Sequence, residues 1–152
     1  LPGFMNGYGI NANYSYIWSR MTVPGRTFNQ PLPRQAPHLF NIALFYEKHN
    51  IQARLAVNYK SAYLMELNLA ATEINGENQL INPSTDQYDI FYGAFTSMDF
   101  SISYKLNKHF SIYTEWNNLL NSPLRIYRGI KERPVQTEYY SIRGIIGVKF
   151  NL

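Results

Sequence analysis

The side chains that could do chemistry in this chain are charged and amide groups that recur at every second position of extended segments. Alternate side chains of an extended strand point to the same face, so each series predicts one polar face. Such groups can contact a hydrated ligand or another polar surface, and otherwise they bind water or one another. Six residues are candidates for these contacts: Arg54, Asn58, Lys60, Asp99, Glu115 and Arg143.

The sequence carries no arrangement that predicts catalysis, a cofactor or a metal site. His49 and His109 fall in predicted tight turns, where a solvated imidazole is expected. Asp86 and Asp89 share a loop, but calcium takes six or more oxygen ligands, so we expect both carboxylates to be solvated. The chain has no cysteine, which excludes a thiolate metal site and a Cys nucleophile. It also lacks a Gly-rich phosphate loop and a Gly-x-Ser-x-Gly motif. We expect no enzyme activity.

The elements that position these side chains are predicted from a period of two. From Tyr8 to Trp18 one set of alternate residues is apolar and aromatic, and the interleaved set is small and polar apart from Ile17. Strict alternation of this kind predicts a half-buried strand. The pattern predicts an all-β fold whose strands cover residues 7–20, 38–47, 51–64, 96–106, 110–128 and 139–152.

The connections between these strands alternate between short and long. Lys48-His49-Asn50 and Asn107-Lys108-His109 predict tight hairpin turns. Met21–Pro37, Met65–Phe95 and Ile130–Glu138 are long and contain turn and loop signals such as Asn-Gly and Asn-Pro. All tight turns therefore lie at one end of the predicted sheet and all long loops at the other. Outer-membrane barrels show this asymmetry.

Asparagines interrupt the alternation inside the fifth predicted strand. They are Asn117, Asn118 and Asn121. We interpret them as a β-bulge near the loop end of the strand, with a structural role.

Strand length and composition favour a membrane over water as the partner of the apolar face. Charged residues make up 16% of the chain, below the ~25% usual in soluble domains, and aromatic residues also make up 16%. The strands run to ten or more residues, as a transmembrane strand of ~9–11 residues requires. Aromatic residues such as Trp18, Tyr46 and Tyr104 lie near strand ends, where an interface girdle is expected. A soluble β-sandwich or barrel that binds a small apolar ligand inside remains the alternative.

Six strands predict a partial barrel. Closed bacterial barrels start at about eight strands, and each unpaired backbone group in hydrocarbon costs several kcal/mol. The chain therefore either assembles with copies of itself or is one portion of a larger antiparallel transmembrane β-barrel. Its start at Leu1 favours the second. The net charge of +4 comes from scattered residues, so nucleic-acid binding is not expected.

Several segments together resemble the end of the barrel of TonB-dependent outer-membrane receptors. They are LPGFMNGYGINANYSYIWS at the start, ALFYEKHNIQARLAVNYKSAYL from Ala43, YKLNKHFSIYTEWNNLLNSPLRIYRG from Tyr104, and the closing YYSIRGIIGVKFNL. The third segment carries a Glu-x-x-Asn-Leu-x-Asn feature that starts at Glu115. One departure is the last residue, Leu152, where such barrels usually end on an aromatic residue; here Phe150 lies two residues earlier.

The resemblance implies six C-terminal strands of a barrel of about 22 strands that is plugged by a separate domain. It implies a cell outer-membrane location in a Gram-negative organism and import of a siderophore, vitamin or oligosaccharide driven by TonB. The implied partners are the remaining barrel, the plug, TonB, outer-membrane lipid and a surface lipoprotein. The six candidate polar residues would face the lumen, and Arg125, Tyr127 and Arg128 would lie toward the extracellular ligand. A structural or adhesive barrel without TonB coupling remains an alternative function.

Overall fold

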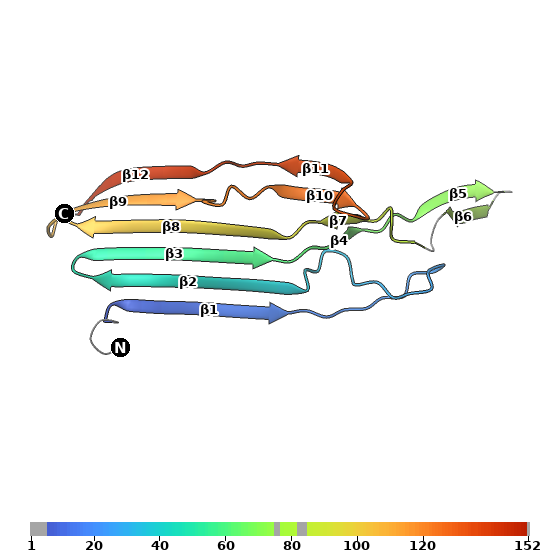
Figure 1. Ribbon diagram of the computed structural model, residues 1–152, viewed down its shortest axis with the longest axis horizontal. Coiled ribbons are helices and arrows are strands. Elements are labelled where there is room, and N and C mark those ends of the chain that lie inside the picture. The colour runs from blue at the N-terminus through green and yellow to red at the C-terminus, as the bar shows by residue number, and fades with distance from the viewer. Residues whose placement is uncertain (1–5, 75–76, 82–84, 152) are drawn as a thin grey trace.

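The computed structural model describes residues 6–74, 77–81 and 85–151, and this part of the chain is built from antiparallel β-strands without helices (Figure 1). It contains no helix that is long and apolar enough to cross a membrane. The largest sheet has six strands in the order β1-β2-β3-β8-β9-β12. Their bounds are β1 (Tyr8–Tyr16), β2 (His38–Lys48), β3 (Ile51–Lys60), β8 (Phe95–Lys105), β9 (Phe110–Asn117) and β12 (Arg143–Phe150). One of these strands overlaps each of the six predicted ranges; β2 ends one residue beyond its range, at Lys48, and β8 begins one residue before its range, at Phe95.

The six-stranded sheet keeps one apolar face across its width. Residues directly opposite each other in an antiparallel pair share a face. The register places these apolar residues in one row across five strands: Ile10, Leu44, Leu55, Phe100 and Trp116. The row ends at Gly144 in β12, where a Cβ would meet the ring of Trp116. The period of two therefore directs the apolar side chains of all these strands to the same face of the sheet.

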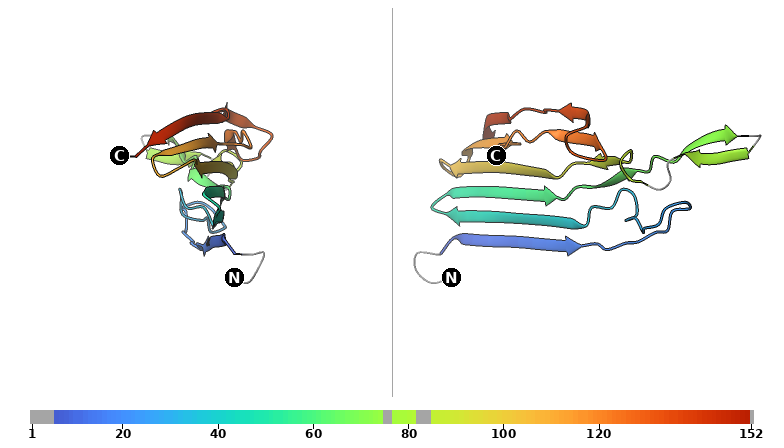
Figure 2. Two further views of the ribbon diagram at one scale, coloured as in Figure 1. Left: turned by 90° about the vertical axis from the view of Figure 1, so that its left-hand side faces the viewer. Right: turned by 45° about the vertical axis from the view of Figure 1, so that its right-hand side comes forward.

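This sheet is a single layer with two free edges. Viewed end-on, the described residues place no second layer of strands over it (Figure 2). All nine residues of β1 are exposed, and on β12 Ile146 is 75% exposed. β1 and β12 lie at opposite edges of an open sheet, and the six strands do not close on one another. Burial of the apolar face and pairing of both edges would therefore need a partner outside these residues.

Both predicted tight turns are present, and they lie at the same end of the sheet (Figure 1). Between β2 and β3, His49 and Asn50 have φ of 53° and 64°. Positive φ at both central residues defines the two-residue hairpin turn whose twist matches the flanking strands. Between β8 and β9, the side-chain Oδ1 of Asn107 accepts hydrogen bonds from the backbone N–H of His109 at 2.9 Å and of Phe110 at 3.0 Å. An Asn that bonds to the backbone two residues on favours a turn.

The long connections are more ordered than the sequence predicted. They contribute β7, β11 and a separate hairpin, β5 with β6. β7 and β11 join β4 and β10 in a second sheet of order β11-β10-β7-β4, and all of these strands lie at the end opposite the tight turns (Figure 1). Their bounds are β4 (Tyr63–Glu66), β5 (Ala70–Ile74), β6 (Glu77–Ile81), β7 (Ile90–Tyr92), β10 (Leu124–Arg128) and β11 (Pro134–Glu138). The Asn75-Gly76 and Asn82-Pro83 turn signals lie outside the described residues.

Several predicted strands are therefore too long. The range 51–64 holds β3 and then β4, and 110–128 holds β9 and then β10. β1 ends at Tyr16 rather than residue 20, and 139–152 contains only the eight residues of β12. For the ranges 51–64 and 110–128, the reason is that β4 and β10 leave the main sheet and pair with β7.

The interruption in the fifth predicted strand ends that strand and is not a bulge. Asn118 and Asn121 both have positive φ, at 56° and 46°, a conformation that Asn adopts more readily than most residues. The backbone N–H of Asn118 donates to Oδ1 of Asp99 at 2.9 Å, and that of Leu119 donates to the carbonyl of Met98 at 2.8 Å. The predicted structural role of these asparagines is therefore a turn that separates β9 from β10.

Most of the buried apolar side chains lie at the loop end of the molecule, away from the large sheet. Leu64 is 1% exposed, and Val23, Ala36 and Tyr127 are also buried. Leu64 and Tyr127 lie on one face of the second sheet, because both pair with Phe91. The connection 21–37 is tied to this sheet by a hydrogen bond of 2.7 Å from the Arg34 N–H to the Leu64 carbonyl. A small core thus orders the loop end.

Candidate functional site

The six candidate polar residues share one face of the large sheet. Arg54, Asn58 and Lys60 alternate along β3, and Asp99 lies opposite Ala56 of the same series. Ser101 links Arg54 to Glu115, because it pairs with Arg54 on one side and with Glu115 on the other. Arg143 lies opposite Asn117, two residues beyond Glu115. The alternation alone therefore placed all six on the face opposite the apolar row.

Amide side chains form a row across this polar face. Asn41 Nδ2 donates to Asn13 Oδ1 at 2.7 Å, and Asn58 Nδ2 donates to Ser97 Oγ at 3.3 Å. Asn41 also lies opposite Asn58 in the register, so the row crosses β1, β2, β3 and β8. These hydrogen bonds run across neighbouring strands, and each amide still has free hydrogen-bonding capacity. They form a surface suited to water and to polar partners.

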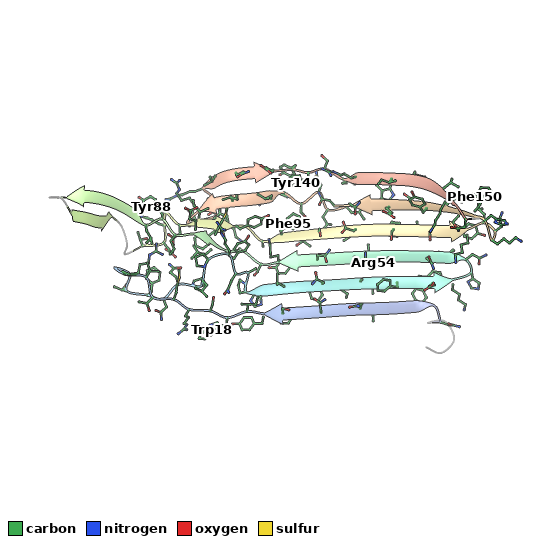
Figure 3. The ribbon with its side chains drawn as sticks, turned by 180° about the vertical axis from the view of Figure 1, so that it is seen from behind. Trp18, Arg54, Tyr88, Phe95, Tyr140 and Phe150 are labelled. Carbon is green, nitrogen blue, oxygen red and sulfur yellow. The ribbon has the colours of Figure 1, made fainter. Side chains whose placement is uncertain are left out.

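Arg54 is central on the polar face (Figure 3). Its guanidinium carbon lies 5.8 Å from the centroid of the Phe45 ring, in the adjacent strand. A groove of about 290 Å³ runs beside it and reaches Glu115 and Tyr113. Among the described residues no ion pair involves Arg54, Asp99 or Glu115. The groove therefore presents one cation, Arg54, and two carboxylates, Glu47 and Glu115, and none of the three forms an ion pair among the described residues.

Lys60 and Asp99 have structural partners. The Lys60 ammonium lies 4.4 Å from the ring centroid of Tyr92 and 5.1 Å from that of Tyr63. These two rings stack on each other with centroids 5.1 Å apart. A cation over an aromatic face gains about 0.5–1 kcal/mol at an exposed site. Lys60 thus joins the large sheet to the second sheet, while Asp99 holds the turn that starts at Asn118.

The three residues predicted to contact a ligand lie in β10, but they do not converge. Tyr127 is buried and stacks on Phe91, with ring centroids 5.6 Å apart, and burial raises the pKa of its phenol. Arg125 and Arg128 are exposed. They are three positions apart in one strand, so they point to opposite faces. A ligand bound to one face of β10 would therefore contact at most one of the two arginines.

Sequence reasoning missed a buried ion pair at the loop end. Arg26 Nη1 donates to Asp89 Oδ2 at 2.6 Å, and Nη2 donates to Oδ1 at 2.7 Å. Neither side chain has exposed surface. Asp89 Oδ1 also accepts the Asn68 N–H at 2.9 Å, and the Asp89 carbonyl accepts the Gly129 N–H at 2.9 Å. The expectation that Asp89 is solvated is therefore wrong.

The ion pair joins connections that are distant in the sequence. Arg26 follows β1, Asp89 precedes β7, and Gly129 follows β10. Hydrogen bonding to Asp89 raises the pKa of Arg26, so the guanidinium is charged at all physiological pH values. No local signal could have found the pair, because its members are 63 residues apart. The apolar residues Ile90-Phe91-Tyr92 directly after Asp89 indicate burial of this segment, but they do not identify Arg26 as the partner.

The described residues offer no group of three or more His, Cys, Asp or Glu that could hold a metal ion. Two regions offer surfaces for a partner: the groove beside Arg54 and the ordered loop end. Comparison of the chain with protein-family models, curated proteins and solved structures found no match.

Proposed function

We propose that this chain is part of a TonB-dependent transporter in the outer membrane of a Gram-negative cell, and that it imports a scarce nutrient. The observation that carries the proposal is the single-layer sheet with one uncovered apolar face and one polar face. Monomeric soluble proteins rarely expose apolar patches larger than a few hundred Å². A face that spans six strands needs an apolar solvent, and lipid supplies it.

The dimensions of the sheet support a membrane span. β2 and β8 have 11 residues each, and a transmembrane strand needs ~9–11. The turn end of the apolar face carries Tyr8 opposite Tyr46 and Phe110 opposite Phe150. The loop end carries further aromatic residues, including Tyr14 of β1. Rings at both ends of an apolar band suit the two lipid headgroup regions.

In this proposal β1 and β12 pair with other strands of a barrel of about 22 strands. The polar face lines the interior and contacts a plug domain through groups such as Arg54 and Glu115. The tight turns face the periplasm and the ordered loop end faces outward, as in other outer-membrane barrels. The nutrient, a siderophore, vitamin or oligosaccharide, arrives at the loop end, where a surface lipoprotein could cover it. TonB drives its import.

Paired cysteine variants test the membrane assignment. The chain has no cysteine of its own, so Ile42→Cys and Asn41→Cys each add one label site to it. These neighbours in β2 point to opposite faces. In the whole protein reconstituted into lipid, a spin label at position 42 should be relaxed by oxygen, and one at 41 by a water-soluble nickel chelate. Equal access of the chelate to both would refute the membrane assignment.

Cell fractionation tests the rest of the proposal. An antibody to residues 139–152 should detect a heat-modifiable outer-membrane band far above the 17.7 kDa of this chain. The same protein should be cross-linked to TonB in growing cells. An outer-membrane band without cross-linking would favour a structural or adhesive barrel. A soluble band would favour a β-protein that binds an apolar ligand.

A further inference from the structure

A second hollow lies on the polar face near the turn end of the large sheet, where β8, β9 and β12 run side by side (Figure 1). It has a volume of about 650 Å³, within the ~300–1,000 Å³ of typical small-ligand sites. Lys105 of β8, Ser111 of β9 and Lys149 of β12 all line it. The hollow adjoins the groove beside Arg54, because Tyr113 borders both.

The strand register sets the two lysines on either side of one hydroxyl group. Ser111 pairs with Lys105 on one side and with Lys149 on the other, so all three side chains point to the same face. Neighbouring strands lie about 4.8 Å apart, which separates the two lysine Cα atoms by roughly 10 Å. The four-carbon stem of lysine is flexible, so both ammonium groups can reach a ligand that lies over Ser111.

Hydrogen bonds fix the backbone near both lysines. The Lys105 N–H donates to the carbonyl of Asn50, in the tight turn between β2 and β3, at 2.9 Å. Two residues after Lys149, the Asn151 N–H donates to the carbonyl of His109, in the other tight turn, at 2.8 Å. Both strand ends are therefore held before any ligand arrives. A ligand would have to order only the lysine side chains, which keeps the entropic cost of binding small.

The positive charge of these lysines has no counter-ion nearby. In the part of the chain that the structure describes, neither lysine forms an ion pair. Glu115 is the one carboxylate of the described residues that lines the hollow, and it lies four residues from Ser111 along β9, roughly 14 Å at about 3.4 Å per residue. The turn end of the hollow therefore carries two positive charges that a ligand is free to neutralise.

Neutral donors complete the lining of the hollow. They are the hydroxyl groups of Ser103, Ser111 and Tyr113 and the amides of Gln52 and Asn151. A phosphate monoester carries a charge of about −1.5 to −2 at pH 7 and three strong acceptor oxygens. Its charge matches two ammonium groups, and its oxygens can accept from both of them and from a hydroxyl group at once. A carboxylate has one charge and two oxygens, so it matches the donors less well.

We propose that Lys105, Ser111 and Lys149 bind a phosphate dianion, either inorganic phosphate or the phosphate group of a soluble monoester. The two ammonium groups hold the oxyanion from opposite sides, and the Ser111 hydroxyl donates to it between them. Lysine binds phosphate as a point charge, so the site needs no planar fork of donors. The inference goes beyond the proposed transport function, because it depends on the polar face of three strands and not on lipid or TonB.

Phosphorus NMR titration of the whole purified protein tests the site, with inorganic phosphate and glycerol 3-phosphate as probes. At least one probe should bind wild-type protein at low salt. Lys105→Gln and Lys149→Gln should each weaken that binding by about tenfold or more, since each removes a charged hydrogen-bond donor. The matched control is Lys108→Gln, because Lys108 is exposed at the same end of the sheet but does not line the hollow. Its loss should change the affinity by about twofold at most, because salt screens a distant exposed charge.

Thermal melts of the ligand-free variants separate binding from folding. Lys105 and Lys149 are exposed, so both variants should melt at the temperature of wild type. Absence of binding by both probes would overturn the proposal. Unchanged affinity in both lysine variants, or an equal loss in Lys108→Gln, would also overturn it.

Two competitors identify the class of anion. Acetate should displace the phosphate probe only at about tenfold higher concentration or more, because it carries one negative charge. Equal potency of acetate would show a contact for carboxylates, such as those of an acidic peptide, and would overturn the phosphate assignment. Short-chain phosphatidylglycerol is a phosphodiester with one charge. If it binds more tightly than glycerol 3-phosphate and depends on both lysines, the site takes a lipid headgroup and the proposal is lost.

Discussion

The buried pair of Arg26 and Asp89 offers the sharpest test of how the loop end is held together. Asp89→Asn keeps the size of the side chain and removes its charge. The Arg26 guanidinium then remains buried without a counter-ion, and two charge-assisted hydrogen bonds of 2.6 and 2.7 Å weaken. Removal of one partner of a buried pair costs about 3–5 kcal/mol. We expect this cost to fall on the loop end, because both residues lie outside the large sheet.

Native-state hydrogen exchange measures that local cost. The reporters are amides whose hydrogen bonds close the loop end: the N–H of Arg34, bonded to Leu64, and the N–H of Gly129, bonded to Asp89. A loss of 3–5 kcal/mol corresponds to an increase of about 10²–10³-fold or more in their exchange rates, at 1.4 kcal/mol per factor of ten. The matched reporters are amides in β2 and β3, whose exchange should change little.

The double variant Arg26→Met with Asp89→Leu separates the cost of an unpaired charge from the value of the pair. Replacement of a buried pair by apolar residues of similar volume is often neutral, because the desolvation cost disappears along with the attraction. The double variant should therefore exchange more slowly than Asp89→Asn alone. The reasoning is refuted if Asp89→Asn leaves both reporter amides as protected as in wild type, or if the double variant exchanges fastest.

Three further predictions concern the same end of the molecule. Gly129→Ala should lower the free energy of unfolding by about 1–3 kcal/mol in urea titrations, because its φ is +66° and a Cβ would collide with the Gln87 carbonyl. The control is Gly9→Ala, whose Cβ would make only an ordinary van der Waals contact with Phe45. Burial raises the pKa of Tyr127 above 10.0, so the phenol loses its proton at lower pH in the unfolded chain, and the free energy of unfolding should fall above about pH 10. Thermal melts of Tyr127→Phe should show a smaller fall over this pH range, and an identical fall would contradict the prediction. Asn118→Ala should destabilise more than Asn118→Gly by about 1 kcal/mol in the same titrations, because the residue has φ of 56° and glycine adopts that conformation freely; equal stabilities would rule out backbone strain as the cause.

The large sheet was predictable because its pattern is local. Each strand alternates by itself, and once the tight turn at His49 and Asn50 sets the register, Leu44 must lie opposite Leu55. A slip by one residue would move every apolar side chain to the polar face, so the pattern also specifies the pairing. The placement of Arg54 and Glu115 on one face followed from the same rule. Neither the register of β2 and β3 nor the shared face of Arg54 and Glu115 depends on a contact between segments that are distant in the sequence.

The second sheet was not predictable for the opposite reason. β7 has three residues, too few for a period to be recognised, and it pairs with β4 and β10 across the long connections. Tyr63 follows Tyr59 in the same alternate series, so residues 51–64 were predicted as one strand, although Ser61 between them breaks the apolar series where β3 ends. The candidate ligand residues of β10 lie at the loop end, but the burial of Tyr127 against Phe91 depends on that long-range pairing.

By itself, the amino-acid sequence determined an all-β chain with one apolar and one polar face, and with turns short at one end and long at the other. Side-chain alternation and turn chemistry act over a few residues, so they can be read directly. Only the tertiary structure decided that Arg26 and Asp89 meet and that most of the small core lies at the loop end. Those contacts join segments tens of residues apart, and their free energy depends on burial that exists only once the loops have packed.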